Sequence, residues 1–220
     1  GQYDCLDGVL FPAICDVIRN LSGVWKLEFP RKLSRYMDVP QNFDREVGGR
    51  FWRAELEALS ADLTARGARP YDPAALGRSI ELYNESRRLV RALYAMRVEQ
   101  PWRVPTWELY LVLRAGLVLP IEEFNELLLP YHAALVAETS RLPVDQARVL
   151  LAGSFCEQPP LGLLITLERS GCYIVDDDLV QVHRWIEGDI AVGDDPLGDL
   201  VLAFRGQSTD SPTRYVGRGK

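Results

Sequence analysis

Residues 147–178 read ARVLLAGSFCEQPPLGLLITLERSGCYIVDDD, and this stretch decides the fold. An apolar run at 149–152 ends in a turn of small residues that carries Cys156, and a leucine-rich segment with helical spacing follows the paired prolines. A second apolar run then leads into three consecutive aspartates at 176–178. The order strand, turn, helix, strand predicts half of a parallel α/β layer, in which ligands gather where strands end.

The first 50 residues also alternate strands and helices. The apolar run at 8–11 predicts a strand, and a helix is expected from Cys15 to about residue 27. A short strand is expected at 34–39, before a proline and a polar break. This order places Cys15 at the turn between a strand and a helix.

The region between these two segments has apolar residues at helical spacing. Helices are expected to begin near Phe51, Pro73, Thr106 and Pro120. Pro130 lies inside the last of these helices and predicts a kink or a split. Two further helices are expected at 179–186 and 196–205.

These elements predict an α/β protein in which a helical insert covers or bridges two sheet-containing halves. Residues 1–50 would end a first α/β domain, 51–145 would form a helical connecting region, 146–205 would start a second α/β domain, and 206–220 would be an irregular tail. The sequence has no initiator methionine and opens almost directly into a strand, so we expect it to be a fragment of a longer polypeptide.

Composition excludes several classes of function. Acidic residues outnumber basic ones by 31 to 25, and a net charge of −6 argues against nucleic-acid binding by phosphate neutralisation. No apolar run approaches the ~20 residues of a membrane-spanning helix. The first residues do not resemble a signal peptide, so we expect the protein to be cytoplasmic, where thiols stay reduced. The sequence contains no phosphate-binding loop, so ATP hydrolysis by this chain is not expected.

The cysteines are the main candidates for chemistry. None of the four forms a C-x-x-C pair, so a metal site would have to be assembled from distant segments. Cys15 precedes a helix whose first amides would favour a thiolate; the alternative is a buried thiol that acts as a small hydrophobe. Cys156 lies in a tight turn before a helix, and ordinary loop packing is its alternative. Cys5 and Cys172 are interpreted as structural.

The aspartates at 176–178 have several possible roles. Their side chains must alternate in direction along a strand. We expect them mainly to cap the start of a helix or to be exposed to solvent. The alternatives are that they hold the cysteine loop or act in acid–base chemistry. His183 and Arg184 would be a proton donor and an anion clamp, although an ordinary surface role is favoured for His183. His132 is interpreted as structural.

Three segments together resemble a known family. They are FPAICDVIRNLSGVWK at 11–26, DVPQNFD at 38–44, and GSFCEQPP at 153–160 followed by GCYIVDDD at 171–178. They are similar to the 2-hydroxyacyl-CoA dehydratase D-component family, and within it to the smaller non-activator subunits of ATP-dependent benzoyl-CoA reductases. The resemblance covers most of the chain. It implies parts of two doubly wound (Rossmann-like) parallel-sheet domains with a helical segment between them.

The resemblance also implies a function. A [4Fe–4S] cluster would be bound in a complex with a homologous sister subunit, and a separate ATP-hydrolysing iron–sulfur activator would supply electrons. The substrate would be an acyl-CoA thioester, and the reaction would be reductive dearomatisation of an aryl-CoA. Cys15 matches the family's cluster cysteine, whereas Cys156 is typical of the reductase branch and is either a ligand or a residue of the cluster pocket.

Other expectations from the resemblance are open. Further cluster ligands would lie outside these 220 residues, and no residue matches an acid–base catalyst of the family. A 2-hydroxyacyl-CoA dehydratase subunit, which would use the same cluster in a radical lyase, is one alternative. A non-catalytic subunit that relays electrons or acts as a scaffold is the other.

Overall fold

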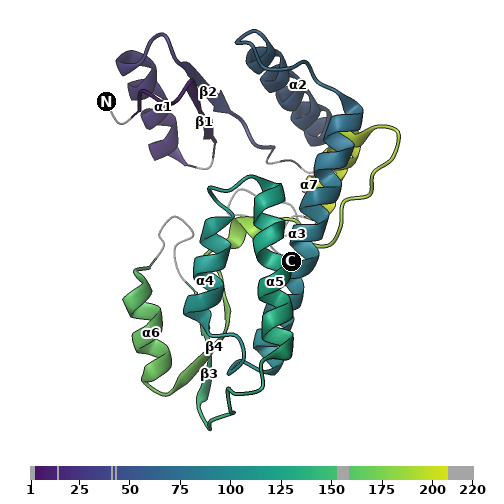
Figure 1. Cartoon of the computed structure of the whole chain (residues 1–220). Helices are drawn as coiled ribbons and strands as arrows, with labels where there is room; N and C mark the ends of the chain where they lie inside the picture. Colours follow the sequence, from purple (N-terminus) through teal and green to yellow (C-terminus); the bar gives the residue numbers. More distant parts are fainter. Residues whose placement is uncertain (1–2, 14, 41, 43, 153–158, 208–220) are drawn as a thin grey trace. The chain divides into compact units, whose positions relative to one another are not determined.

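The computed structural model describes residues 3–13, 15–40, 42, 44–152 and 159–207 (Figure 1). The chain divides into two compact units. The first comprises Gly1–Pro73 and Leu197–Lys220, and the second comprises Ala74–Pro196. The second unit therefore contains most of the predicted helical region together with the segment at 147–178.

The first unit contains a parallel strand pair. Strands β1 (Gly8–Pro12) and β2 (Leu33–Met37) run side by side, and helix α1 (Asp16–Glu28) connects them. Parallel strands need such a crossover, because a tight turn can only join antiparallel ones. Trp25 is the buried residue of α1, and its ring packs against Phe29 at a centroid distance of 4.4 Å. The strand at 8–11 and the helix after Cys15 are thus confirmed.

Three further elements belong to the first unit. A π-helical turn η1 (Arg45–Gly49) is capped by the carboxylate of Asp44 and leads into α2 (Arg50–Thr64). Helix α7 (Pro196–Gln207) returns to this unit from the other end of the chain. The rings of Trp52 in α2 and Phe204 in α7 lie 5.0 Å apart, and this contact joins the two helices.

The second unit combines helices with the other parallel strand pair. It contains α3 (Pro73–Glu99), α4 (Thr106–Ala115), α5 (Ile121–Ala137), β3 (Ala147–Leu151), α6 (Leu161–Arg169) and β4 (Cys172–Asp177). β3 and β4 are parallel, with a register shift between Val149 and Leu150. The core of the second unit is made of fully buried apolar side chains, among them Val90, Leu93, Val104, Leu109, Leu128 and Leu164.

Two expectations about helices differ from the structure. The helix expected at 179–186 is only a 3₁₀ turn, η2 (Gln181–Arg184). Leu179 and Val180 are both buried in the core, so this segment is tied down immediately after β4 and does not develop a helical face. Helix α5 does not split, and it runs through Pro130 to Ala137.

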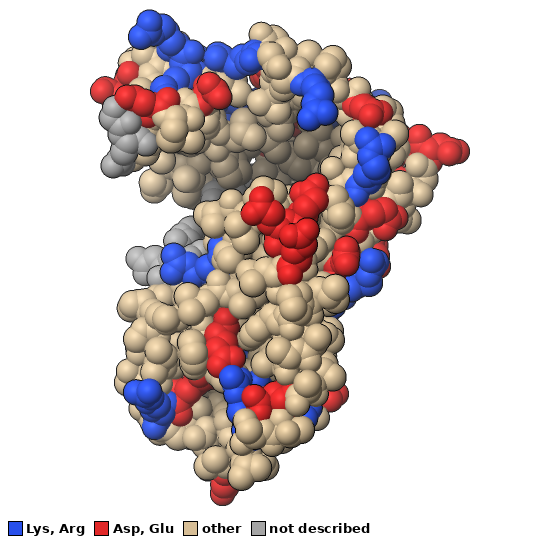
Figure 2. Space-filling view, viewed as in Figure 1, with Lys and Arg blue, Asp and Glu red and all other residues tan. Residues whose placement is uncertain are grey.

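Mixed helices and short parallel sheets are compatible with the predicted α/β class, and the doubly wound arrangement stays a prediction. On the face drawn in Figure 2, acidic side chains gather in one group over the start of α5. Glu122 and Glu123 lie in the first turn of α5, where carboxylates oppose the positive end of the helix dipole. Within the described residues, no helix has both the length and the apolarity needed to cross a bilayer.

Candidate functional site

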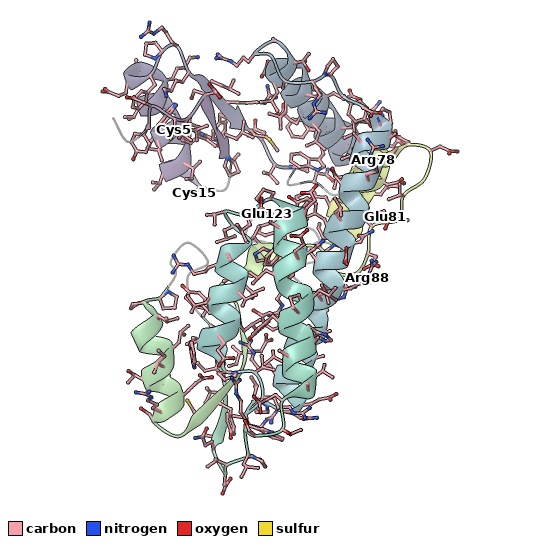
Figure 3. All side chains as sticks on the ribbon, viewed as in Figure 1. Cys5, Cys15, Arg78, Glu81, Arg88 and Glu123 are labelled. Carbon is pink, nitrogen blue, oxygen red and sulfur yellow. The ribbon has the colours of Figure 1, made fainter. Side chains whose placement is uncertain are left out.

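Cys15 lies directly after the carboxyl end of β1 (Figure 3). The amide of Ala13 still donates to the carbonyl of Met37 at 2.9 Å, so the pairing with β2 continues almost to the cysteine. Cys15 itself is extended, with φ −163° and ψ 167°, and α1 begins at the next residue. Its thiol is exposed, so the alternative of a buried small hydrophobe is wrong.

Charged side chains lie next to Cys15 at the start of α1, where Asp16 is the following residue and Arg19 comes one turn later. The first amides of α1 carry the positive end of the helix dipole, which stabilises negative charge nearby. The guanidinium of Arg19, one turn into α1, lies 5.8 Å from the ring centre of Tyr36, and the hydrogen bond with Tyr36 raises the pKa of Arg19. Iron–sulfur clusters are held by cysteine thiolates, so an exposed thiol at a helix start is a donor of the right kind.

The other cysteines of the described chain lie elsewhere. Cys5 is exposed but precedes β1, so it lies at the opposite end of that strand from Cys15. Cys172 begins β4 and is half-buried, and its thiol donates to the carbonyl of Leu167 at 3.0 Å. Burial raises the pKa of Cys172, which disfavours a thiolate there. Cys172 is thus bonded within the fold, in line with the structural role expected for it.

Cys156 lies outside the described residues, and the expectation about it stays a prediction. The described chain nevertheless defines where its segment starts. Leu151, the last residue of β3, is the register partner of Asp177, and its carbonyl accepts a hydrogen bond from the amide of Asp178 at 3.4 Å. Strand β3 therefore ends at the sheet edge at which Asp177 and Asp178 lie.

Asp177 is the buried member of the aspartate run. Its carboxylate accepts hydrogen bonds from Arg97 at 2.5 Å, from the hydroxyl of Tyr94 at 3.2 Å and from the amide of Leu179 at 3.0 Å. The side chain of Arg97 is 1% exposed and that of Asp177 is 4% exposed. A buried charge pair of this kind is tolerated because each partner compensates the other. Asp177 therefore fastens β4 to α3.

Asp176 is more exposed than Asp177 but belongs to the same group of charges, because its carboxylate lies 4.0 Å from the guanidinium of Arg97. Its carboxylate accepts from Arg184 at 2.7 Å, and its side chain is 38% exposed. The ring of Tyr94 lies between two guanidiniums, 4.4 Å from that of Arg97 and 4.0 Å from that of Arg184. Burial and the neighbouring Asp177 carboxylate raise the pKa of Tyr94, so its hydroxyl remains a donor. These groups form one polar network, in which the Nε atom of Arg97 is buried without a hydrogen-bond partner.

This network was only partly predictable. The aspartates were recognised, and Asp177 does cap the turn at Leu179, but Arg97 and Tyr94 were missed. They lie in the last two turns of α3, 80 and 83 residues from Asp177, and no local pattern distinguishes them from solvent-facing residues. Arg184, the expected anion clamp, binds the protein's own Asp176.

The surface role expected for His183 is wrong. It is half-buried, its ring lies 5.1 Å from that of Phe124, and its Nε2 atom is 2.8 Å from the carbonyl oxygen of Leu113. Burial lowers the pKa of His183, so the folded protein holds the ring neutral. His132, on α5, is also half-buried.

The pKa of His183 predicts how stability depends on pH. Below the unfolded-state pKa of about 6.5, the unfolded chain binds a proton that the folded chain resists. The stabilisation present above that pH is therefore lost as the pH falls. We expect the melting temperature to fall less between about pH 7.5 and about pH 5.5 in His183→Gln than in the wild type. Equal slopes for the variant and the wild type would contradict this prediction.

No three side chains among the described His, Cys, Asp and Glu residues are grouped so that they could hold a metal ion. Cys15 lies exposed after the carboxyl end of β1, and its role as a ligand stays a prediction. In the second unit, the corresponding edge of β3 and β4 is occupied by the Asp–Arg–Tyr network.

Comparison with known proteins defines the class of this chain. Residues 1–213 match the family model described as 2-hydroxyglutaryl-CoA dehydratase, D-component. The chain belongs to this family, as the three segments of sequence indicated.

Individual relatives narrow the comparison. The chain is 50% identical to a benzoyl-CoA reductase subunit of Thauera aromatica over 214 residues, which is 97% of this chain and 55% of that protein. It is 30% identical to the beta subunit of lactoyl-CoA dehydratase from Anaerotignum propionicum, over 100% of this chain and 58% of that protein. It is 25% identical to the beta subunit of (R)-2-hydroxyglutaryl-CoA dehydratase from Acidaminococcus fermentans, over 96% of this chain and 55% of that protein. The chain thus spans about half the length of these curated relatives.

Proposed function

We propose that this chain is part of the iron–sulfur subunit of an ATP-dependent aryl-CoA (benzoyl-CoA) reductase. The reaction is reductive dearomatisation of the ring, with electrons from a separate ATP-hydrolysing activator. The observation that carries the proposal is the 50% identity to a benzoyl-CoA reductase subunit, against 30% and 25% to dehydratase subunits. Because the relatives are named as subunits, we include a homologous sister subunit as partner.

In this proposal, Cys15 and Cys156 would help to hold a [4Fe–4S] cluster. The cluster would supply single electrons at low potential. The chain's own task is to present the thiolate of Cys15 and to stabilise it at the start of α1. The exposed thiol, its place at the end of β1 and the polar first turn of α1 all support this role.

The order of elements supports Cys156 as a second participant. In the first unit, β1 leads to Cys15, then to α1 and the parallel strand β2. In the second unit, β3 leads to the segment with Cys156, then to α6 and the parallel strand β4. Each cysteine thus follows the carboxyl end of the first strand of a parallel pair, which is where α/β proteins bind ligands.

The test compares substrates. The complete protein, purified without oxygen together with its sister subunit and activator, is assayed with benzoyl-CoA and, separately, with lactoyl-CoA and 2-hydroxyglutaryl-CoA. We expect ATP-dependent reduction of benzoyl-CoA and no dehydration of the hydroxyacyl thioesters. Dehydration of a hydroxyacyl thioester without ring reduction would instead assign the protein to a 2-hydroxyacyl-CoA dehydratase. An iron-containing complex that is inactive on all three thioesters would refute the substrate class.

A further inference from the structure

A cavity of about 280 Å³ lies within the second unit. Helix α3 contributes Tyr83, Ser86 and Arg87 to its wall, and η2 contributes His183. Sites for drug-sized ligands usually have volumes of ~300–1,000 Å³, so this cavity suits a smaller molecule. None of these residues belongs to the network around Asp177 or to the cysteines.

Arg87 is the charged group of this cavity. Its guanidinium is half-buried, and burial is the main cause that lowers the pKa of Arg87. One of its terminal nitrogens donates to the side-chain oxygen of Asn84, whereas its Nε atom is buried without a hydrogen-bond partner. A buried donor left unpaired in this way costs free energy that a bound acceptor would recover.

The protein does not supply a carboxylate to Arg87 from its described part. Asp189, the acid that acts on Arg87 electrostatically, is bonded to Arg88 at 2.6 Å and to Arg91 at 2.7 Å. Arg88 projects from the same helix (Figure 3). In the described chain, no carboxylate oxygen lies within ion-pair distance of Arg87. The cavity therefore presents a cation that is not neutralised at contact distance.

The remaining wall defines what kind of anion fits. Leu117, Val182 and Ile186 give the cavity an apolar side. His183 is held neutral by burial and uses its Nε2 hydrogen on the carbonyl of Leu113, so it adds no second positive charge. A single positive charge beside apolar walls matches a monoanion with an apolar body better than a phosphate dianion, which would remain undercompensated.

We propose that this cavity binds a small monocarboxylate with an apolar body, whose carboxylate pairs with Arg87. The apolar body lies against Leu117, Val182 and Ile186, and the hydroxyl of Ser86 is available to the carboxylate. The proposal goes beyond the reductase function and uses neither Cys15 nor Cys156. A protein without the cluster should therefore still bind the carboxylate.

The experiment titrates the complete protein, in its complex, with benzoate, with isobutyrate and with inorganic phosphate by calorimetry. We expect saturable binding of a carboxylate and none of phosphate. Arg87→Gln should weaken carboxylate binding by about tenfold or more, the usual effect of losing a charged hydrogen-bond partner. Arg91→Gln is the matched control, because it removes the same charge from the same helix but from a residue paired with Asp189.

A second variant guards against misfolding of Arg87→Gln. Val182→Phe fills the cavity without changing a charge, and it should block carboxylate binding at an unchanged melting temperature. No saturable binding to the wild type, or binding that survives both Arg87→Gln and Val182→Phe, would overturn the site. Phosphate binding as tight as that of benzoate would overturn the assignment to apolar monocarboxylates.

Discussion

Replacing Cys15 with serine in the complete protein is expected to remove most of its iron and acid-labile sulfide, and with them the reduction of aryl-CoA. Iron in these clusters is held by thiolates, and a serine hydroxyl does not provide such a ligand at neutral pH. Because the thiol is exposed and makes no capping hydrogen bond in α1, the substitution removes no contact that the first unit needs to fold. The loss should therefore appear in iron content and in the visible absorption spectrum, while the far-ultraviolet circular dichroism stays that of the wild type.

Cys172→Ser is the matched control for this experiment. The same atom is exchanged, but Cys172 is half-buried at the start of β4 and donates to Leu167. A serine hydroxyl can make the same hydrogen bond, so iron content and turnover should stay normal. If Cys15→Ser kept both iron and turnover, Cys15 would not be a ligand and the scaffold alternative would be favoured.

Replacing Arg97 with methionine is expected to destabilise the protein by about 3–5 kcal/mol, as the loss of one partner of a buried ion pair does. The substitution leaves the carboxylate of Asp177 buried without its cation, 2.5 Å from where the guanidinium was. It also removes one of the two guanidiniums that stack on Tyr94. Chemical denaturation, followed by circular dichroism, measures the change.

Two further variants isolate the cause. Arg91→Met removes an arginine from the same helix, but Arg91 is 43% exposed and its pair with Asp189 should contribute only about 0–1 kcal/mol. The double variant Arg97→Met with Asp177→Leu removes both charges together and should recover much of the lost stability. The assignment fails if Arg97→Met costs no more than Arg91→Met, or if the double variant is as unstable as the sum of the single ones.

Much of the local structure was predictable from the sequence. Strands at 8–11 and 149–152 and helices that begin at Pro73 and Thr106 are present, because apolar runs and caps are local signals. The place of Cys15 between a strand and a helix was predictable for the same reason. Its exposure was not, because exposure depends on what the rest of the unit covers.

The errors have a common physical origin in long-range contacts. The pattern after Asp178 looked helical, yet burial of Leu179 and Val180 stops the chain after one short turn. His183 looked like a surface residue until the structure placed Phe124 and the carbonyl of Leu113 against it. In both cases the deciding partners lie outside the window that a periodic pattern covers.

The buried ion pair of Arg97 and Asp177 has an evolutionary consequence. A substitution of either residue alone is disfavoured, because it leaves the other charge buried without a partner. Relatives should therefore either keep both or have exchanged both for apolar side chains, so that the two positions covary across the lineage although 80 residues separate them.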